Sequence, residues 1–255
     1  MIVLALTWRP RGEAARFVRL HSHLMQLYDA ITIAASPDTT SEEVSAVSAL
    51  PGVDLHIRDV WKAGRHEAVR RALLAGADFV HYADTDRLLR WVERLPEELN
   101  HAVEQIASAD CLVPGRTPAA FATHPRALQD TERITNGVFS QILGQTVDFS
   151  AGSKGFSRAC AEFILRNSPP EYPIGTDSEW IVLAWRGGFE VRPAFFDGLD
   201  WESADQFQAE AADPERQSRL AAEYDRDPAH WQTRLRIAQE IIDAGFEALR
   251  RPLIT

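Results

Sequence analysis

The chain has 255 residues, of which 45% are hydrophobic and 25% are charged, and its formal net charge at neutral pH is −10. This composition is typical of a globular protein with one large domain. The negative charge argues against nonspecific nucleic-acid binding, because such binding needs a basic surface that replaces the counterions of the phosphates. We therefore expect no nucleic-acid partner.

The sequence shows no signal for export or for membrane insertion. The apolar run at the N-terminus is too short for a signal peptide, and no stretch reaches the roughly 18 apolar residues of a membrane span. Cys111 and Cys160 form neither a CxxC motif nor a disulfide framework, which fits a reducing compartment. We expect a cytoplasmic protein without a transmembrane segment.

Short apolar runs alternate with segments of helical periodicity in the first half of the chain. The predicted strands are residues 2–7, 30–35, 54–57, 79–83 and 111–113. The predicted helices are residues 13–28, a short segment capped by Ser41, the segment from Gly64 to Gly76, and a segment that Pro96 opens. Strands separated by helices in this way form βαβ units. The pattern therefore predicts an α/β fold with a mainly parallel sheet.

The pattern is less regular beyond residue 114, and the last fifty residues are strongly helical. We expect a helix from about Pro125 to Leu143 and a catalytic domain over residues 1–204, with a nucleotide-binding half at 1–113 and an acceptor half at 114–204. Residues 205–255 form a helical extension. Its apolar stripe comprises Trp231, Leu235, Ala238, Ile242, Phe246 and Leu249. This stripe needs a partner, so we expect the extension to close over the site or to build a homodimer interface.

Two carboxylates follow the apolar strand at residues 79–83. Asp84 and Asp86 stand one residue apart at its carboxyl end, where open α/β sheets place their ligands. Such hard oxygen ligands suit Mg²⁺ or Mn²⁺, and these ions usually bridge to substrate phosphates. A second pair, Asp225 and Asp227, lies in a polar break between helical segments, where we expect a turn and a helix start.

Several common phosphate-binding motifs are missing. No GxGxxG follows the first strand, and no GxxxxGK[ST] occurs, so neither a dinucleotide-binding Rossmann site nor a P-loop is supported. The DTDRLL segment superficially suggests a haloacid-dehalogenase phosphatase. In that class the nucleophile belongs to the first strand, whereas here the acidic pair follows the fourth.

Taken in order, four segments resemble motifs of GT-A-fold glycosyltransferases of the family 2 kind, over roughly residues 1–200. They are residues 7–13 with Gly12 in place of an Asn, the acidic turn 36–40, the helix start Gly64-Arg65, and Thr176-Asp177 before Gly188-Phe189 with Thr176 in place of a Glu. The stretch from Asp84 to Asp177 also resembles mannosylglycerate synthase and its retaining relatives. In those enzymes a C-terminal His commonly completes the metal shell. Residues 195–207, the segment at the end of the last strand, contain no His, so Asp200, Asp197 or water is expected instead.

The resemblance implies a donor site for a nucleotide-diphosphate sugar. Asp84 and Asp86 would bind Mn²⁺ or Mg²⁺, and Asp84 and Thr85 would also face the donor. The residues expected around the base, ribose and diphosphate are Thr7, Arg9, Glu13, Asp38 and Arg65, with Lys62 as a second candidate for the diphosphate. Caps and turns explain several of these residues equally well, Glu13 among them.

On the acceptor side the resemblance points to Asp177. It would act as the general base of an inverting enzyme or position the acceptor in a retaining one. The alternative is an N-cap for the helix that begins near Ser178. Residues 153–155 (Ser153, Lys154, Gly155) match a glycine-rich acceptor loop, although a tight turn explains them nearly as well. We expect His66 to face solvent and His81, Trp180 and Trp185 to pack in the core.

The resemblance predicts a metal-dependent glycosyltransferase that uses a nucleotide-diphosphate sugar and a small-molecule or glycan acceptor. Two alternatives remain open. One is a catalytically degenerate GT-A domain that acts as a binding or assembly module, because Gly12, Thr176 and the missing His depart from the family pattern. The other is a nucleotidyltransferase, although residues 7–14 contain only one glycine where those enzymes carry a glycine-rich loop.

Overall fold

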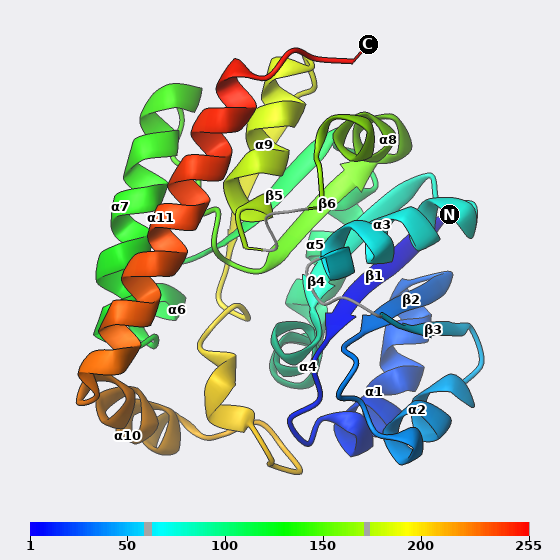
Figure 1. Ribbon diagram of the computed structural model, residues 1–255. Helices are drawn as coiled ribbons and strands as arrows, with labels where there is room; N and C mark the ends of the chain where they lie inside the picture. The colour runs from blue at the N-terminus through cyan, green and yellow to red at the C-terminus, as the bar shows by residue number, and fades with distance from the viewer. Residues whose placement is uncertain (59–62, 171–173, 255) are drawn as a thin grey trace.

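In a computed structural model, which describes residues 1–58, 63–170 and 174–254, helices cover both faces of one mixed sheet (Figure 1). The described strands are β1 (Ile2–Trp8), β2 (Ala30–Ala35), β3 (Val53–Ile57), β4 (Phe79–Asp84), β5 (Cys111–Arg116), β6 (Ser153–Ser157) and β7 (Val191–Phe196). Their order in the sheet is β3-β2-β1-β4-β6-β5-β7. Only β6 runs antiparallel to its neighbours β4 and β5. The predicted α/β fold with a mainly parallel sheet is confirmed.

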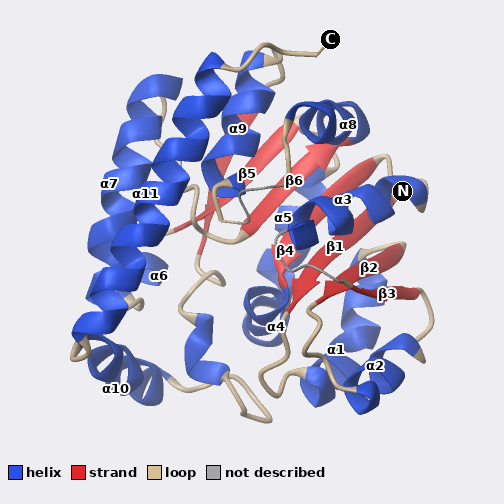
Figure 2. Cartoon of the chain, viewed as in Figure 1, coloured by secondary structure: helices blue, strands red, loops and turns tan. Residues whose placement is uncertain are grey.

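Figure 2 shows how helices and strands alternate along the chain. The helices of the first half are α1 (Ala14–Leu27), α2 (Ser41–Ser48), α3 (Gly64–Leu74), α4 (Thr85–Arg94) and α5 (Pro96–Ile106). Those of the second half are α6 (Pro118–Ala122), α7 (Arg126–Leu143), α8 (Arg158–Asn167), α9 (Thr176–Arg186), the short 3₁₀ helix η2 (Glu202–Asp205), α10 (Pro214–Asp225) and α11 (Pro228–Arg250).

Strand β1 explains why the sheet needs helices on both faces. Val3 and Ala5 belong to the apolar core that α3, α7, α8, α9 and α11 complete. Leu4 and Leu6 belong to the core on the opposite face, together with side chains of α1, α2, α4 and α5. A strand that is apolar at every position is typical of a parallel sheet buried on both sides.

Most predicted elements exist, and the differences are local. Helix α4, which the sequence pattern did not predict, begins directly after β4, so Asp86 lies in the first turn of a helix. The cap of α2 is Thr40 rather than Ser41. Thr40 and Glu43 form a reciprocal capping box, in which each side chain accepts a hydrogen bond from the other residue's backbone N–H.

Asp225 and Asp227 both cap the starts of helices, as expected. Asp227 caps α11 by accepting a hydrogen bond from the N–H of Ala229 at 2.9 Å. Asp225 accepts hydrogen bonds from the N–H groups of Arg126 and Ala127 and so caps α7 from a distant part of the chain. Both carboxylates satisfy N–H groups that a helix leaves unpaired.

Helix α11 lies beside α7 and α9 and packs against both (Figure 1). The predicted stripe is partly wrong, because Leu235 is 59% exposed. The buried line of the helix instead comprises Ile241, Ala244, Gly245 and Ala248. The chain itself therefore covers the apolar face, and a homodimer through these helices stays a prediction. None of the described helices is both long enough and apolar enough to cross a membrane.

Candidate active site

The ends of β1 and β4 meet at one edge of the sheet. Thr7 and Asp84 are register partners, so their side chains lie next to each other. Thr7 Oγ1 donates to Asp84 Oδ1 at 3.0 Å, and the hydroxyl of Tyr82 donates to the same oxygen at 2.6 Å. Thr85 Oγ1 donates to the carbonyl of Thr7 at 2.8 Å. These bonds fix the orientation of Asp84 where open α/β sheets bind their ligands.

A cleft of about 260 Å³ opens at this edge. Its walls include seven of the predicted donor and metal residues: Thr7, Arg9, Glu13, Arg65, Asp84, Thr85 and Asp86. Asp38 does not line the cleft but accepts a hydrogen bond from Nε of Arg9 at 3.3 Å. Lys62 lies outside the described residues. The structure thus assembles most of the predicted donor site in one place.

The cleft also contains residues that the sequence pattern missed, among them the charged Arg87 and Glu202. Arg87 directly follows Asp86 in the sequence, and only this adjacency could have indicated that Arg87 belongs to the site. Glu202 comes from η2, more than one hundred residues away along the chain. Its signal was weak, since it is one of several acidic residues after the last strand.

The carboxylates in the cleft repel one another. Burial and the negative charges of Glu202 and Asp84 raise the pKa of Asp86 to about 7, and Arg87 offsets only part of this effect. Glu202 Oε2 is buried and has no hydrogen-bond partner. A cation with a preference for hard oxygen ligands would relieve this excess of negative charge, so the donor set fits Mg²⁺ or Mn²⁺.

The described side chains alone do not surround a metal ion. Within residues 1–58, 63–170 and 174–254, no three His, Cys, Asp or Glu side chains form a group able to hold a metal. Binding would therefore depend on Asp84 and Asp86 with oxygen atoms from a ligand or water, or on a movement of Glu202. Magnesium in proteins commonly keeps several waters and phosphate oxygens in this way.

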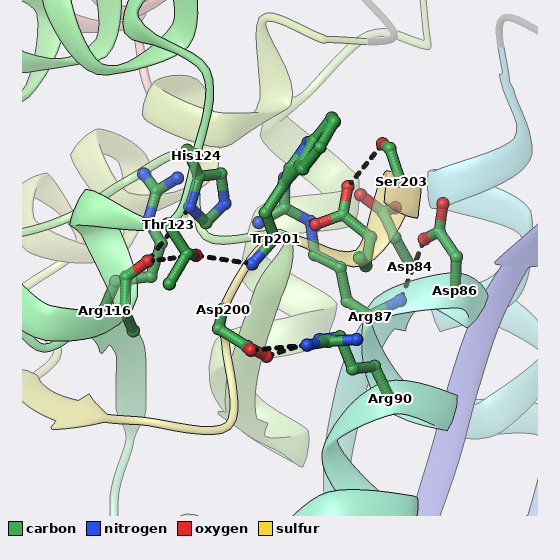
Figure 3. A network of polar contacts seen from close by, with 12 residues as sticks. Asp84, Asp86, Arg87, Arg90, Arg116, Thr123, His124, Asp200, Trp201 and Ser203 are labelled. Atoms are coloured by element: carbon green, nitrogen blue, oxygen red, sulfur yellow. Dashed lines mark hydrogen bonds and ion pairs between the residues drawn. The ribbon is translucent and has the colours of Figure 1, made fainter. Parts of the chain in front are cut away.

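The expectation that Asp200 or Asp197 completes the metal shell is wrong for this structure. Figure 3 shows Asp200 turned toward Arg90 and away from Asp84 and Asp86. Both oxygens of Asp200 accept hydrogen bonds from Arg90, at 2.6 and 2.7 Å. Asp197 accepts a hydrogen bond from Thr117. Neither carboxylate lines the cleft, which leaves Glu202 as the acidic residue of this segment that does.

A second charged cluster lies beneath the cleft around Asp177. Arg65 donates to Asp177 Oδ1 at 2.6 Å and approaches Asp84 Oδ2 at 3.4 Å. Nζ of Lys154 donates to the same oxygen of Asp177 at 3.0 Å. Thr176, which departs from the family pattern, accepts a hydrogen bond from Arg65 at 2.9 Å. Arg65 therefore connects Asp177 with the acidic pair.

The surroundings of Asp177 are not those expected of an N-cap or of a general base. Asp177 is the second residue of α9, and Gly175 occupies the cap position, so the N-cap alternative is wrong. Burial alone would raise the pKa of this carboxyl, but the positive charges of Arg65 and Lys154 hold it below its ordinary value. Asp177 is 5% exposed and does not line the cleft. Such a carboxylate is a weak proton acceptor, and its catalytic role stays a prediction.

Ser153, Lys154 and Gly155 do not form the expected loop, because they belong to the inner strand β6. Ser153 Oγ bonds to Nε2 of His81 at 2.8 Å. A Cβ on Gly155 would lie 2.4 Å from Ile106, so only glycine fits at this position. All three residues are buried. They support the site from within the sheet, and contact with an acceptor remains only a prediction from the resemblance.

His66, His81 and Trp180 lie in the core, whereas the expectation that Trp185 packs there is wrong, because it is 42% exposed. His81 and Trp180 are buried, as expected. The expectation that His66 faces solvent is wrong, because it is 8% exposed and its Nε2 lies 2.7 Å from Ser168 Oγ. Its ring also meets Trp180 edge-on at 5.3 Å. Burial, together with the nearby charge of Arg65, lowers the pKa of His66 to about 4.

Glu13 occupies the cap position of α1, but its side chain forms no cap. Its carboxylate instead accepts hydrogen bonds from the backbone N–H of Arg11 and from the indole of Trp8. Glu13 therefore shapes the loop between β1 and α1 that forms one wall of the cleft.

Comparison with known proteins supports the fold. No protein-family model matches the chain, and no curated protein matches its sequence. Among solved structures, a mycobacterial protein matches with a TM-score of 0.62 at 16% identity, over 99% of this chain and 76% of that chain. Glucosyl-3-phosphoglycerate synthase of Mycobacterium tuberculosis matches with a TM-score of 0.58 at 16% identity, over 99% of this chain and 81% of that chain.

A third match is the same Mycobacterium tuberculosis enzyme in complex with Mn²⁺, UDP-glucose and phosphoglyceric acid. Its TM-score is 0.55 at 15% identity, over 99% of this chain and 80% of that chain. Identities this low establish a shared fold and no more. The predicted GT-A fold is thus confirmed by the strand order and by these structures.

Proposed function

We propose that this protein is a metal-dependent glycosyltransferase that moves a sugar from a nucleotide-diphosphate sugar to an acceptor. The observation that carries the proposal is the group of three carboxylates, Asp84, Asp86 and Glu202, around a cleft at the carboxyl ends of β1 and β4, where the other two raise the pKa of Asp86. Diphosphate-handling sites of GT-A enzymes lie at this edge. The likeness to an enzyme solved with Mn²⁺ and UDP-glucose adds support.

In this proposal Asp84 and Asp86 hold Mn²⁺ or Mg²⁺, and Glu202 supplies a further oxygen where the family commonly has a His. When bound, the cation neutralises charge that develops on the leaving nucleotide. Thr7 and Tyr82 keep Asp84 in position through the hydrogen bonds described above. The contacts around the cleft support each of these roles.

The remaining donor contacts come from the cleft walls. Arg65 reaches toward the diphosphate, while Arg9, Glu13 and Asp38 lie near the ends of β1 and β2, where the base and ribose would bind. Thr85 also lines the cleft. An arginine fork suits this task because its planar donors match phosphate oxygens.

Asp177 has a positioning role in this proposal. It holds Arg65 beside Asp84, and Lys154 balances its charge from β6. The acceptor is not identified. Because the similar mycobacterial enzyme was solved with phosphoglyceric acid, a small anionic acceptor is the first class to test.

Nucleotide binding tests the proposal directly. Calorimetry with UDP, GDP and ADP, with and without Mn²⁺, should reveal one nucleotide whose binding requires the metal. In thermal unfolding, a true ligand at 100 times its dissociation constant should add about 2.7 kcal/mol to the free energy of unfolding. Asp86→Ala should abolish this binding. Asp54→Asn is the matched control, because Asp54 is exposed and pairs with Arg71 away from the cleft.

Product analysis separates the alternatives. A glycosyltransferase should slowly hydrolyse its donor to nucleotide diphosphate and free sugar in the presence of Mn²⁺. A degenerate binding module should bind the nucleotide without hydrolysis. A nucleotidyltransferase should instead release pyrophosphate from a nucleoside triphosphate and a sugar phosphate. Metal-independent binding, or none at all, would contradict the proposal.

A further inference from the structure

Phe207 combines two unfavourable features. It is 76% exposed, and its φ of +58° makes it the one non-glycine residue with a positive φ among the residues that the structure describes. The left-handed region is costly for a bulky side chain, and an exposed ring gains nothing from burial. Folding alone would favour glycine or asparagine here.

The segment that carries Phe207 is anchored at both ends by contacts of Asp205. We call residues 206–212 the strap. Immediately before it, the buried side chain of Asp205 pairs with Arg16 and Arg90 and accepts a hydrogen bond from the N–H of Ala212. The two ends of the strap are thereby tied together. The conformation of Phe207 is therefore enforced by its surroundings, as expected for functional strain.

The strap touches the wall of the cleft. The N–H of Phe207 donates to the carbonyl of Arg11 at 2.7 Å, and Arg11 lines the cleft. Gly12 permits this approach, because it has a φ of +91° and a Cβ there would lie 2.8 Å from Cα of Phe207. The departure of Gly12 from the family's Asn thus has a physical reason. Phe207 is not among the described residues that line the cleft, but these two unusual backbone positions hold it against the loop that carries Arg11.

We propose that Phe207 forms an outer stacking wall for a ring of the bound ligand. This inference rests on the proposed function, which supplies two such rings: the nucleobase of the donor and the pyranose of a saccharide acceptor. Both have a flat face that packs on an aromatic side chain. Stacking would bury the phenyl ring of Phe207. It would also account for the strained backbone that keeps this ring exposed.

Phe207→Gly and Phe207→Tyr test the inference. The first variant removes the ring and relieves the backbone, and the second keeps the ring. One arm measures the affinity for UDP, GDP and ADP with Mn²⁺ by calorimetry. The other arm measures binding of methyl and p-nitrophenyl glucosides to the Mn²⁺–nucleotide complex by saturation-transfer NMR. We expect Phe207→Gly to weaken binding about fivefold to tenfold in one arm and Phe207→Tyr to retain it.

Thermal unfolding provides the second readout. Phe207→Gly should raise the melting temperature by about 2 °C, because the strain is relieved while the ring contributes little to the core. Leu74→Ala is the matched control, since Leu74 is 72% exposed at the far end of α3 and should alter neither arm. A lower melting temperature for Phe207→Gly would overturn the premise of strain.

The outcomes separate the two proposals. If the wild-type protein binds a nucleotide with Mn²⁺ and Phe207→Gly binds as tightly in both arms, stacking is wrong while the proposed function stands. If the wild-type protein binds no nucleotide, the proposed function fails and the inference fails with it. A loss in the nucleotide arm assigns the wall to the donor, and a loss in the glucoside arm assigns it to the acceptor.

Discussion

Asp86 and Asp177 occupy equivalent local positions and opposite electrostatic environments. Each is the second residue of a helix, α4 and α9 respectively. Burial and two neighbouring carboxylates raise the pKa of Asp86 to about 7. At Asp177, the positive charges of Arg65 and Lys154 outweigh burial and lower the pKa.

This difference separates two tasks within one site. The region around Asp86 has a shortage of positive charge, so a cation can complete it. Asp177 already has two cationic partners, the part-buried Arg65 and the buried Lys154, so its charge is compensated within the chain. The same residue type at the same helix position is therefore poised for metal binding in one case and for structural support in the other.

The largest effect should come from Asp177→Asn. The substitution leaves the buried ammonium of Lys154 without its counter-charge and leaves Arg65 with only its longer contact to Asp84. Breaking a buried ion pair from one side typically costs about 3–5 kcal/mol. Urea denaturation should show a loss of this size in the free energy of unfolding.

Asp86→Asn is the matched comparison. It removes one of several like charges, so the free energy of unfolding should change by less than about 1 kcal/mol or should increase. Mn²⁺-dependent nucleotide binding should nevertheless disappear. Equal destabilisation by Asp86→Asn and Asp177→Asn would show that the two environments do not differ as described.

The next test compares Glu202 with Asp200. Asp200→Asn removes the charge that pairs with the buried Arg90 and should cost about 1–3 kcal/mol of stability. It should leave the affinity for Mn²⁺ unchanged, because Asp200 lies outside the cleft.

Glu202→Gln should have the opposite profile. Loss of a carboxylate beside Asp86 should weaken Mn²⁺ binding about tenfold. Stability should change little, because the lost ion pair with Arg87 is long, at 3.7 Å, and the repulsion of Asp86 is relieved at the same time. Calorimetric titration with Mn²⁺ in the presence of the nucleotide measures the affinity. A loss of affinity in Asp200→Asn and not in Glu202→Gln would reverse the assignment.

A smaller effect concerns pH and the region around Arg65. Burial lowers the pKa of His66 to about 4, below its value of about 6.5 in an unfolded chain. The unfolded state therefore binds the proton more readily, and stability should fall as the pH decreases from about 6.5 to 4. The slope from one such histidine is at most about 1.4 kcal/mol per pH unit.

Melting curves between pH 7 and pH 4.5 measure this dependence, with His66→Gln for comparison. The variant should lose less stability on acidification than the wild-type protein. His81, whose pKa burial lowers to about 3, remains in both proteins and sets the common background. Identical slopes for the two proteins would show that His66 is not buried in its neutral form.

A local effect on stability should come from Gly12→Asn, which introduces the residue that the resembling GT-A motif carries at this position. Asparagine tolerates a positive φ, but its Cβ would approach Cα of Phe207 to 2.8 Å. We expect a stability loss of about 1–2 kcal/mol by thermal unfolding. Gly144→Asn is the control, because Gly144 has a φ of +70° and nothing lies within 4 Å of its position. Equal losses would mean that the contact with the strap is unimportant.

The sequence pattern predicted the first half of the chain better than the second. Apolar runs and helical periodicity are local properties, so they located β1 to β5 and the end of β4 with Asp84 and Asp86. The sequence pattern was less successful for residues 153–155. A polar segment that contains glycine resembles a loop unless the strands beside it are known. In the structure β6 lies between β4 and β5, where backbone pairing on both sides makes it an inner strand.

The sequence by itself determined the α/β alternation, the acidic pair at the end of a buried strand and the resemblance to the GT-A fold. Periodicity encodes which side chains are buried, and this information is contained in a few neighbouring residues. Only the tertiary structure decided that Glu202 rather than Asp200 joins the cleft, that Lys154 and Arg65 balance Asp177, and that Phe207 rests on Gly12. Charges interact through distance in space, and the order of strands in the sheet sets those distances.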